Sequence, residues 1–353
     1  MPPKKKIRVA VIFGGPSSER EVSLSSGREV LKNLPRDKYE LLPVDIKKDN
    51  QRFLKNKKDI DVAFLALHGK FGDDGRIQAL LDKSKIPYTG SSARASALGM
   101  DKLKTRALVQ KAGLKCAKLI KMELRGHTTA VSLSVISRGA EPRTIPRSRN
   151  GAWVNSKKFN LEKLNRLIEQ KISYPCIVKP NQSGSSIGVS IIDSKKQLQK
   201  AIQSASKEDS CILIEEYIHG REMSCGVYGN TSQTQIKALP LTEIIPKSSD
   251  RFFSYDAKYI PGRTREVCPA PISKELTAEI QRLSKIAHTR LVCDGLTRSD
   301  FIIKENKAYF LEINTIPGIT RTSICPQEAK VAGISFPKFL DLQIKLALSR
   351  TEI

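Results

Sequence analysis

The sequence lacks three features that define whole classes of protein. No apolar stretch among its 353 residues approaches the roughly 18 residues that span a bilayer. The basic start Met1–Arg8 is followed only by the short run Val9–Phe13, which is too short for the apolar region of a signal peptide. The seven cysteines include no CxxC pair, which argues against a structural zinc site and a disulfide framework. We therefore expect a cytoplasmic protein with reduced thiols and no membrane insertion.

Aromatic residues are also scarce, at 6%, whereas basic residues give a formal net charge of +25. Nucleic-acid bases bind proteins largely by stacking on aromatic side chains. The basic residues are scattered, with local concentrations at Lys47–Lys58 and in residues 121–160. We expect no specific nucleic-acid function, and the charge suits a protein with small anionic ligands.

The first hundred residues alternate between β-rich runs and helical patterns. Expected strands lie at Ile7–Phe13, Tyr39–Val44 and Val62–Leu67. Helical patterns follow the first and the third of these runs, as in a doubly wound parallel sheet. Ligands of such sheets bind beyond the carboxyl ends of the strands. Glu19 and His68 lie at such ends, so we expect them to face a ligand.

Beyond residue 100 the pattern predicts paired strands and long helices, which is typical of α+β units. We expect strands at Cys116–Met122, Cys176–Lys179 and Val189–Ile192, then five further strands, and helices at about 274–291 and 326–348. Residues 125–155 combine prolines, glycines and arginines and read as an irregular basic arm. The expected domains are residues 1–100, 101–213 and 214–353.

Three oxygen-bearing side chains cluster near the C-terminal end. Glu312 and Asn314 are two residues apart, so on a strand they face the same side. Asp300 opens the preceding strand of the expected hairpin. Buried carboxylates need partners, and hard cations such as Mg²⁺ prefer oxygen ligands. The spacing favours a metal site, although ordinary hairpin polarity is the alternative.

A glycine–serine loop, Asn181–Gly188, follows Lys179 at the end of an expected strand. Small residues let backbone amides approach phosphates, and the lysine adds a point charge. The loop is not a Walker motif, because its lysine precedes the glycines, and a simple hairpin turn explains it equally well. Further on, Ile214–Ile218 could offer backbone hydrogen bonds to adenine, although alone it is a solvated charge pair.

Together these pieces resemble the D-alanine–D-alanine ligases of the ATP-grasp superfamily over residues 7–348. The matching motifs are Phe13–Ser23, Ala66–Gly69, Asp73–Gly75, Pro87–Ser91, Met100–Lys102, the Lys179 loop, Asp256–Tyr259, Arg298–Asp300 and Glu312–Gly318. Other ATP-grasp enzymes share the lysine, glutamate and asparagine features but not the blocks around Ser23 and His68. The resemblance implies an N-terminal doubly wound parallel sheet followed by a two-part ATP-grasp fold.

The implied reaction has two steps. ATP phosphorylates the carboxylate of a first D-alanine, and the amine of a second attacks the acyl phosphate, giving a dipeptide for peptidoglycan precursors. ATP is thus a substrate, and two Mg²⁺ or Mn²⁺ ions are the implied cofactors. Cations must meet the charge on the phosphoryl oxygens, and water must be excluded. A homodimer is the implied assembly.

The resemblance also assigns the amino-acid sites. Glu19 would bind the ammonium of the first D-alanine, and His68 would lie near its carboxylate. Ser323 and Ile324 look like the carboxylate site for the second D-alanine. For His68, a capped loop histidine is the alternative.

Further family roles concern the reacting atoms. Arg298 and the amide of Gly318 resemble the oxyanion stabilisers. Ser185 and Tyr259, with Glu19, match a hydrogen-bonded triad that closes the loop over the site. Relatives that make an ester tend to carry phenylalanine at the position of Tyr259, so the tyrosine favours a dipeptide.

The implied ATP and metal sites draw on several segments. Lys102 and Lys179 would hold the phosphates, and Lys258 would reach the γ-phosphate. The remaining nucleotide contacts would come from Ser185, Ser186, Glu215, Glu216, Tyr217, Ile218, Glu222 and Phe252. Asp300, Glu312 and Asn314 would hold the metal ions.

Some positions depart from the family pattern. Ser183 stands where many relatives have an acidic residue, and Glu216 replaces a commonly basic one. Arg321 and Thr322 precede Ser323 where small or histidine residues are usual, which puts the detail of the second amino-acid site in doubt. A D-alanyl-D-serine ligase is a close alternative, and a non-catalytic ATP-binding protein with a basic surface is an alternative of another class.

Overall fold

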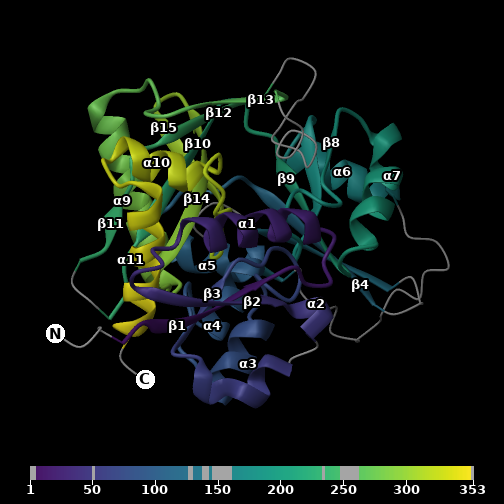
Figure 1. Cartoon of the computed structure of the whole chain (residues 1–353). Coiled ribbons are helices and arrows are strands. Elements are labelled where there is room, and N and C mark those ends of the chain that lie inside the picture. Colours follow the sequence, from purple (N-terminus) through teal and green to yellow (C-terminus); the bar gives the residue numbers. More distant parts are fainter. Residues whose placement is uncertain are drawn as a thin grey trace.

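In the part of the chain that the structure describes, three β-sheets are each flanked by helices (Figure 1). The structure is a computed structural model that describes residues 5–49, 52–125, 130–136, 143–144, 161–232, 235–246 and 262–350. In Figure 1 the N-terminal elements lie at the bottom, the central sheet at the right and the C-terminal sheet at the left. No helix in these ranges is long and apolar enough to cross a membrane.

The N-terminal sheet is parallel, as the sequence predicts, with strand order β2–β1–β3. Its strands are β1 (Ile7–Phe13), β2 (Tyr39–Asp45) and β3 (Val62–Leu65). Its helices are α1 (Arg20–Asn33), α2 (Ile46–Asp49), the 3-10 helix η1 (Arg52–Asp59) and α3 (Arg76–Ser84). This arrangement confirms the predicted α/β class at this end of the chain.

Strand β1 is buried on both faces. Val9 and Val11 belong to a core with α1 and with α11 (Phe336–Leu348), which comes from the far end of the sequence. Ala10 and Ile12, on the opposite face, pack in a core with α3. Alternate residues of a strand face opposite sides, so the continuous apolar run fits a sheet covered by helices on both faces. The C-terminal helix therefore completes the N-terminal core.

The central sheet is antiparallel, with strand order β6–β5–β4–β9–β7–β8. Its strands are β4 (Leu119–Arg125), β5 (Ala130–Ile136), β6 (Arg143–Thr144), β7 (Cys176–Pro180), β8 (Ser190–Ile192) and β9 (Cys211–Glu216). Helices α6 (Leu161–Lys171) and α7 (Lys195–Ser206) pack against it in one apolar core. Helices α4 (Ala93–Met100) and α5 (Lys102–Lys111) precede this sheet in the chain.

The prediction of an irregular arm at residues 125–155 is wrong for part of that segment. Strand β5 pairs with β4 over seven residues. The sequence of β5 alternates apolar residues with serines, which is a strand pattern. The prolines, glycines and arginines around it hid that pattern. The rest of the predicted arm, apart from β4 and β6, lies outside the described residues.

The C-terminal sheet is antiparallel, with strand order β13–β12–β10–β14–β15 and β11 paired to β10. Its strands are β10 (Arg221–Tyr228), β11 (Lys237–Ala238), β12 (Thr242–Pro246), β13 (Thr264–Val267), β14 (Leu296–Lys304) and β15 (Lys307–Asn314). Helices α9 (Lys274–Arg290) and α10 (Ile324–Val331) flank it. Asp300 lies in the middle of β14 rather than at its start, because the strand begins four residues earlier than expected.

Candidate active site

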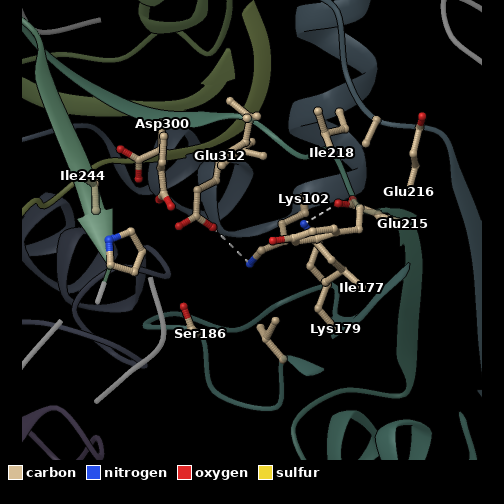
Figure 2. Close-up of a pocket in the computed structure, with 18 of the residues that line it drawn as sticks. Lys102, Ile177, Lys179, Ser186, Glu215, Glu216, Ile218, Ile244, Asp300 and Glu312 are labelled. Atoms are coloured by element: carbon tan, nitrogen blue, oxygen red, sulfur yellow. Dashed lines mark ion pairs between the residues drawn. The ribbon is translucent and has the colours of Figure 1, made fainter. Parts of the chain in front are cut away.

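A cleft of about 330 Å³ lies between the central and C-terminal sheets. Figure 2 shows that β7 and β9 contribute Lys179 and Glu215 on one side, while Asp300 and Glu312 face them from the other. The apolar residues Ile177, Ile218 and Ile244 also line the cleft. The cleft therefore has apolar walls that suit a flat ring, and it also has charged side chains that can contact polar groups of a ligand.

Two lysines of the cleft are held by carboxylates from other elements. Lys179 Nζ lies 2.7 Å from Glu215 Oε2, and both side chains are largely buried. Lys102, the first residue of α5, lies 3.8 Å from Glu312 Oε2 and donates a hydrogen bond to the Ser183 carbonyl at 2.6 Å. Lysine ammonium groups are point charges suited to phosphates. Both lysines therefore line the same cleft, each beside a carboxylate.

The glycine–serine loop closes one side of the cleft. Asn181 fixes its start, because its Oδ1 accepts a hydrogen bond from the Leu103 amide at 2.9 Å. Ser185 and Ser186 have positive φ angles of 47° and 59°, a conformation that non-glycine residues rarely adopt. Ser185 Oγ donates a hydrogen bond to Glu19 Oε2 at 2.5 Å. The loop thus contacts the start of α1.

The hairpin of β14 and β15 brings the predicted metal ligands together. Asp300 pairs in register with Glu312, and Arg298 pairs with Asn314. Asp300 is buried and accepts two hydrogen bonds from Arg298, at 3.0 and 2.8 Å, and another from Ser224. Asn314 Oδ1 accepts a hydrogen bond from the Ile316 amide at 3.0 Å.

Asp300, Glu312 and Asn314 all offer side-chain oxygens, which are the ligands that a hard divalent cation prefers. In this structure Arg298 and Lys102 balance the two carboxylates, Asp300 and Glu312. Within the described residues no group of three or more His, Cys, Asp and Glu side chains could hold a metal ion. A cation at the hairpin would therefore complete its shell with Asn314, ligand oxygens and water.

A second cavity, of about 550 Å³, adjoins the first. Lys102, Ser183 and Glu312 line both cavities, so the two spaces meet at these side chains. Glu19 and His68, which the sequence predicts to face a ligand, line the second cavity. The carboxyl ends of the N-terminal strands thus face the second cavity.

The burial of His68 favours the neutral form of its imidazole. Burial lowers the pKa of His68, and its Nε2 lies 3.0 Å from Ser26 Oγ. Nearby, Asp73 is a cavity residue to which sequence reasoning gave no role. Burial and the carboxylate of Glu19 raise the pKa of Asp73 well above its usual range. Among the described residues, its buried Oδ1 has no hydrogen-bond partner.

The opposite end of the second cavity contains Arg298 and the loop from Gly318 to Ile324. Burial opposes the charge of Arg298, but the neighbouring Asp300 carboxylate outweighs it and raises the pKa of the guanidinium. Ser323 is the N-cap position of α10, and its Oγ accepts a hydrogen bond from the Thr320 amide at 3.1 Å. A helix N-terminus favours anions, which suits a substrate carboxylate.

Most of the predicted site residues therefore line one of two connected cavities. The first is lined by Lys102, Lys179, Ser186, Glu215, Glu216, Tyr217, Ile218, Glu222, Asp300 and Glu312. The second is lined by Glu19, His68, Ser185, Arg298, Asn314, Gly318, Ser323 and Ile324. Phe252, Lys258 and Tyr259 lie outside the described residues.

The fold and the two cavities define a class of protein. Two antiparallel sheets that enclose a cleft lined by lysines and carboxylates are the architecture of ATP-grasp proteins. The family model "D-ala D-ala ligase C-terminus" matches residues 149–345, and "D-ala D-ala ligase N-terminus" matches residues 8–58 and 49–91. The chain belongs to the D-alanine–D-alanine ligase family.

Individual relatives agree with this assignment. The D-alanine–D-alanine ligase of Syntrophobacter fumaroxidans is 40% identical over 344 residues, covering 98% of each chain. The crystal structure of the Bacillus anthracis enzyme complexed with ATP is 30% identical, with a TM-score of 0.74 and 97% coverage of both chains. VanG D-Ala:D-Ser ligase from Enterococcus faecalis is 28% identical, with a TM-score of 0.75, covering 97% of this chain and all of VanG.

Proposed function

We propose that this protein joins two D-alanines to D-alanyl-D-alanine and converts ATP to ADP and phosphate in the same reaction. The observation that carries the proposal is the meeting of two cavities at Lys102 and Glu312. One cavity has the apolar walls and lysines that suit a nucleotide. The other has carboxylates at one end and an arginine with a helix N-terminus at the other, which suits amino acids.

In the first step the carboxylate of one D-alanine attacks the γ-phosphorus of ATP. Glu19 holds the ammonium of that D-alanine, and the neutral His68 lies near its carboxylate. Lys102 and Lys179 hold the phosphates and offset the charge that builds up on the phosphoryl oxygens. The result is an acyl phosphate, whose phosphate is a far better leaving group than the original oxygen.

Nucleotide and metal contacts complete this step. The segment Glu215–Ile218 reads adenine, Glu222 binds the ribose, and Ser186 lies beside the phosphates. Asp300, Glu312 and Asn314 would hold two Mg²⁺ or Mn²⁺ ions, and bound cations would add positive charge at the phosphoryl oxygens. Phe252 and Lys258 are proposed to contact the base and the γ-phosphate.

In the second step the amine of another D-alanine attacks the carbonyl carbon. Arg298 and the Gly318 amide stabilise the oxygen that becomes negative in the tetrahedral intermediate. Ser323 and Ile324 bind the carboxylate of the incoming D-alanine at the start of α10. The Ser185–Glu19 hydrogen bond, extended by Tyr259, keeps the loop closed so that water does not hydrolyse the acyl phosphate.

A D-alanyl-D-serine ligase is the second candidate, because VanG shares the fold over the whole chain. The curated D-alanine–D-alanine ligase of Syntrophobacter fumaroxidans is more similar in sequence, at 40% identity, and Tyr259 favours a dipeptide over an ester. We therefore place D-alanine first as the second substrate. We also propose a cytoplasmic homodimer with domains at residues 1–100, 101–213 and 214–353.

Phosphate release tests the proposal. Purified protein with ATP and Mg²⁺ should liberate phosphate only when D-alanine is added. D-Serine and D-lactate are then each supplied with a limiting amount of D-alanine. The rates of product formation rank the second substrates. Phosphate release that does not depend on D-alanine would exclude the ligase reaction.

A further inference from the structure

One carboxylate of the second cavity has no role in the reaction described so far. Glu266 lies on β13, at the edge of the C-terminal sheet (Figure 1), and lines the cavity together with Thr322, Ser323 and Ile324. It pairs in register with Ile244 on β12, and Ile244 packs against Ile324. Glu266 therefore lies beside the loop proposed to bind the second amino acid.

A hydrogen-bonded amide fixes the Glu266 carboxyl group. Gln327 of α10 donates one hydrogen bond from Nε2 to Glu266 Oε2, at 2.6 Å, and another to the Thr322 carbonyl, at 2.7 Å. An amide nitrogen has two hydrogens, so both are used. The carboxyl group is thereby tied to the Ser323 loop. In the part of the chain that the structure describes, Glu266 Oε1 accepts no hydrogen bond.

The charges of the cavity leave one group of the second substrate without a partner. Its carboxylate has the α10 N-terminus and Ser323, but its ammonium needs an anion. Glu19 accepts a hydrogen bond from Ser185 at the other end of the cavity, and Asp300 is held by Arg298. Glu21, Asp73 and Glu312 also line the cavity, but among the described residues Glu266 is the carboxylate that a hydrogen-bonded side chain ties to the Ser323 loop.

We propose that Glu266 binds the ammonium group of the second D-alanine and accepts a proton from it before the amine attacks. This role rests on the proposed ligase function. The ammonium loses one proton to Glu266 Oε1, which leaves a neutral amine with a free electron pair. That pair forms the C–N bond, and the C–O bond to the phosphate breaks with its electrons on the phosphate. The departing phosphate takes the second proton of the nitrogen, leaving the amide.

The surroundings of Glu266 suit this role. Burial raises the pKa of Glu266 above its ordinary value, although Gln327 and Arg298 oppose the shift. A more basic carboxylate accepts a proton from an ammonium more readily. A carboxylate also favours an ammonium over the neutral hydroxyl of a hydroxy acid, so the same residue would select an amine as nucleophile.

A surrogate nucleophile separates this role from the first chemical step. Hydroxylamine is uncharged near neutral pH and converts the D-alanyl phosphate to a hydroxamate without an ammonium to bind or deprotonate. In Glu266→Gln we expect the KM for the second D-alanine to rise, or dipeptide formation to fall, by about 10-fold to 100-fold, the range for loss of a charge-assisted hydrogen bond. Hydroxamate formation and the KM for ATP should stay within about twofold of the wild type.

Two matched variants guard against a structural explanation. The glutamine of Glu266→Gln still accepts a hydrogen bond from Gln327, so the link to the loop is retained. Gln327→Met breaks that link but leaves the carboxylate, and it should impair dipeptide formation less than Glu266→Gln. Arg265→Gln, at an exposed neighbour on β13, should behave as the wild type.

Three outcomes would overturn the proposal. The first is normal dipeptide formation in Glu266→Gln, and the second is an equal loss of dipeptide and hydroxamate. The third is a larger defect in Gln327→Met than in Glu266→Gln. If the wild type makes neither product, the ligase function itself fails, and the role of Glu266 fails with it.

Discussion

Replacing Arg298 with alanine should affect stability and turnover by two separable routes. Arg298 and Asp300 form a bidentate pair, with side chains only 11% and 6% exposed. Removing one partner of a buried pair leaves an uncompensated charge, at a cost of about 3–5 kcal/mol. The same change removes a donor to the oxyanion, which should lower turnover by at least about 100-fold.

The double variant Arg298→Met/Asp300→Asn distinguishes the two routes. It removes both charges, so it should recover much of the lost stability in urea denaturation while its turnover stays low. Turnover is measured as phosphate release at saturating ATP and D-alanine, on protein whose circular dichroism matches the wild type. Turnover of Arg298→Ala within about tenfold of the wild type would refute the oxyanion role. A double variant as unstable as the single one would refute the buried-charge argument.

Three further predictions concern other parts of the molecule. Lys179→Met should weaken ATP binding by at least about 10-fold, since it removes a charge-assisted contact. Equilibrium nucleotide binding measures this affinity, and an unchanged affinity would exclude a phosphate role for Lys179. Burial lowers the pKa of His288 to about 4, so its contribution to stability is complete above the unfolded pKa of about 6.5 and is lost as the pH falls toward 4. Thermal unfolding between pH 7 and 4.5 should therefore show a steeper loss for the wild type than for His288→Gln, and equal slopes would contradict the assignment. Neutralising Lys47, Lys48, Lys55, Lys57 and Lys58 together should leave turnover within about twofold, because these side chains are surface charges, and a large loss in phosphate release would show a functional basic surface.

Local patterns in the sequence predict much of this fold. The alternation of apolar runs and helices predicts the parallel N-terminal sheet, because each run is short, β-rich and followed by a turn. The packing of α11 on that sheet could not be predicted, since its apolar face fits any apolar partner. Strand β5 was missed because composition outweighed its two-residue alternation.

The site was predictable to a similar degree. Spacing places Glu312 and Asn314 on one face of a strand, and the β14–β15 register brings Asp300 opposite Glu312. The role of Arg298 as the partner of Asp300 is a matter of side-chain geometry, which spacing does not specify. Glu266 carried no signal of its own in the sequence, and Asp73 stood in a matching motif without a role, because only the folded chain shows that both line the cavity.

The central claim is that an oxygen of the D-alanine carboxylate is phosphorylated and then leaves as part of the released phosphate. D-Alanine labelled with oxygen-18 in its carboxylate tests this most directly, with the released phosphate analysed by mass spectrometry. The proposed mechanism predicts that each phosphate formed along with dipeptide carries one labelled oxygen. Unlabelled phosphate released in step with dipeptide would contradict the acyl phosphate mechanism.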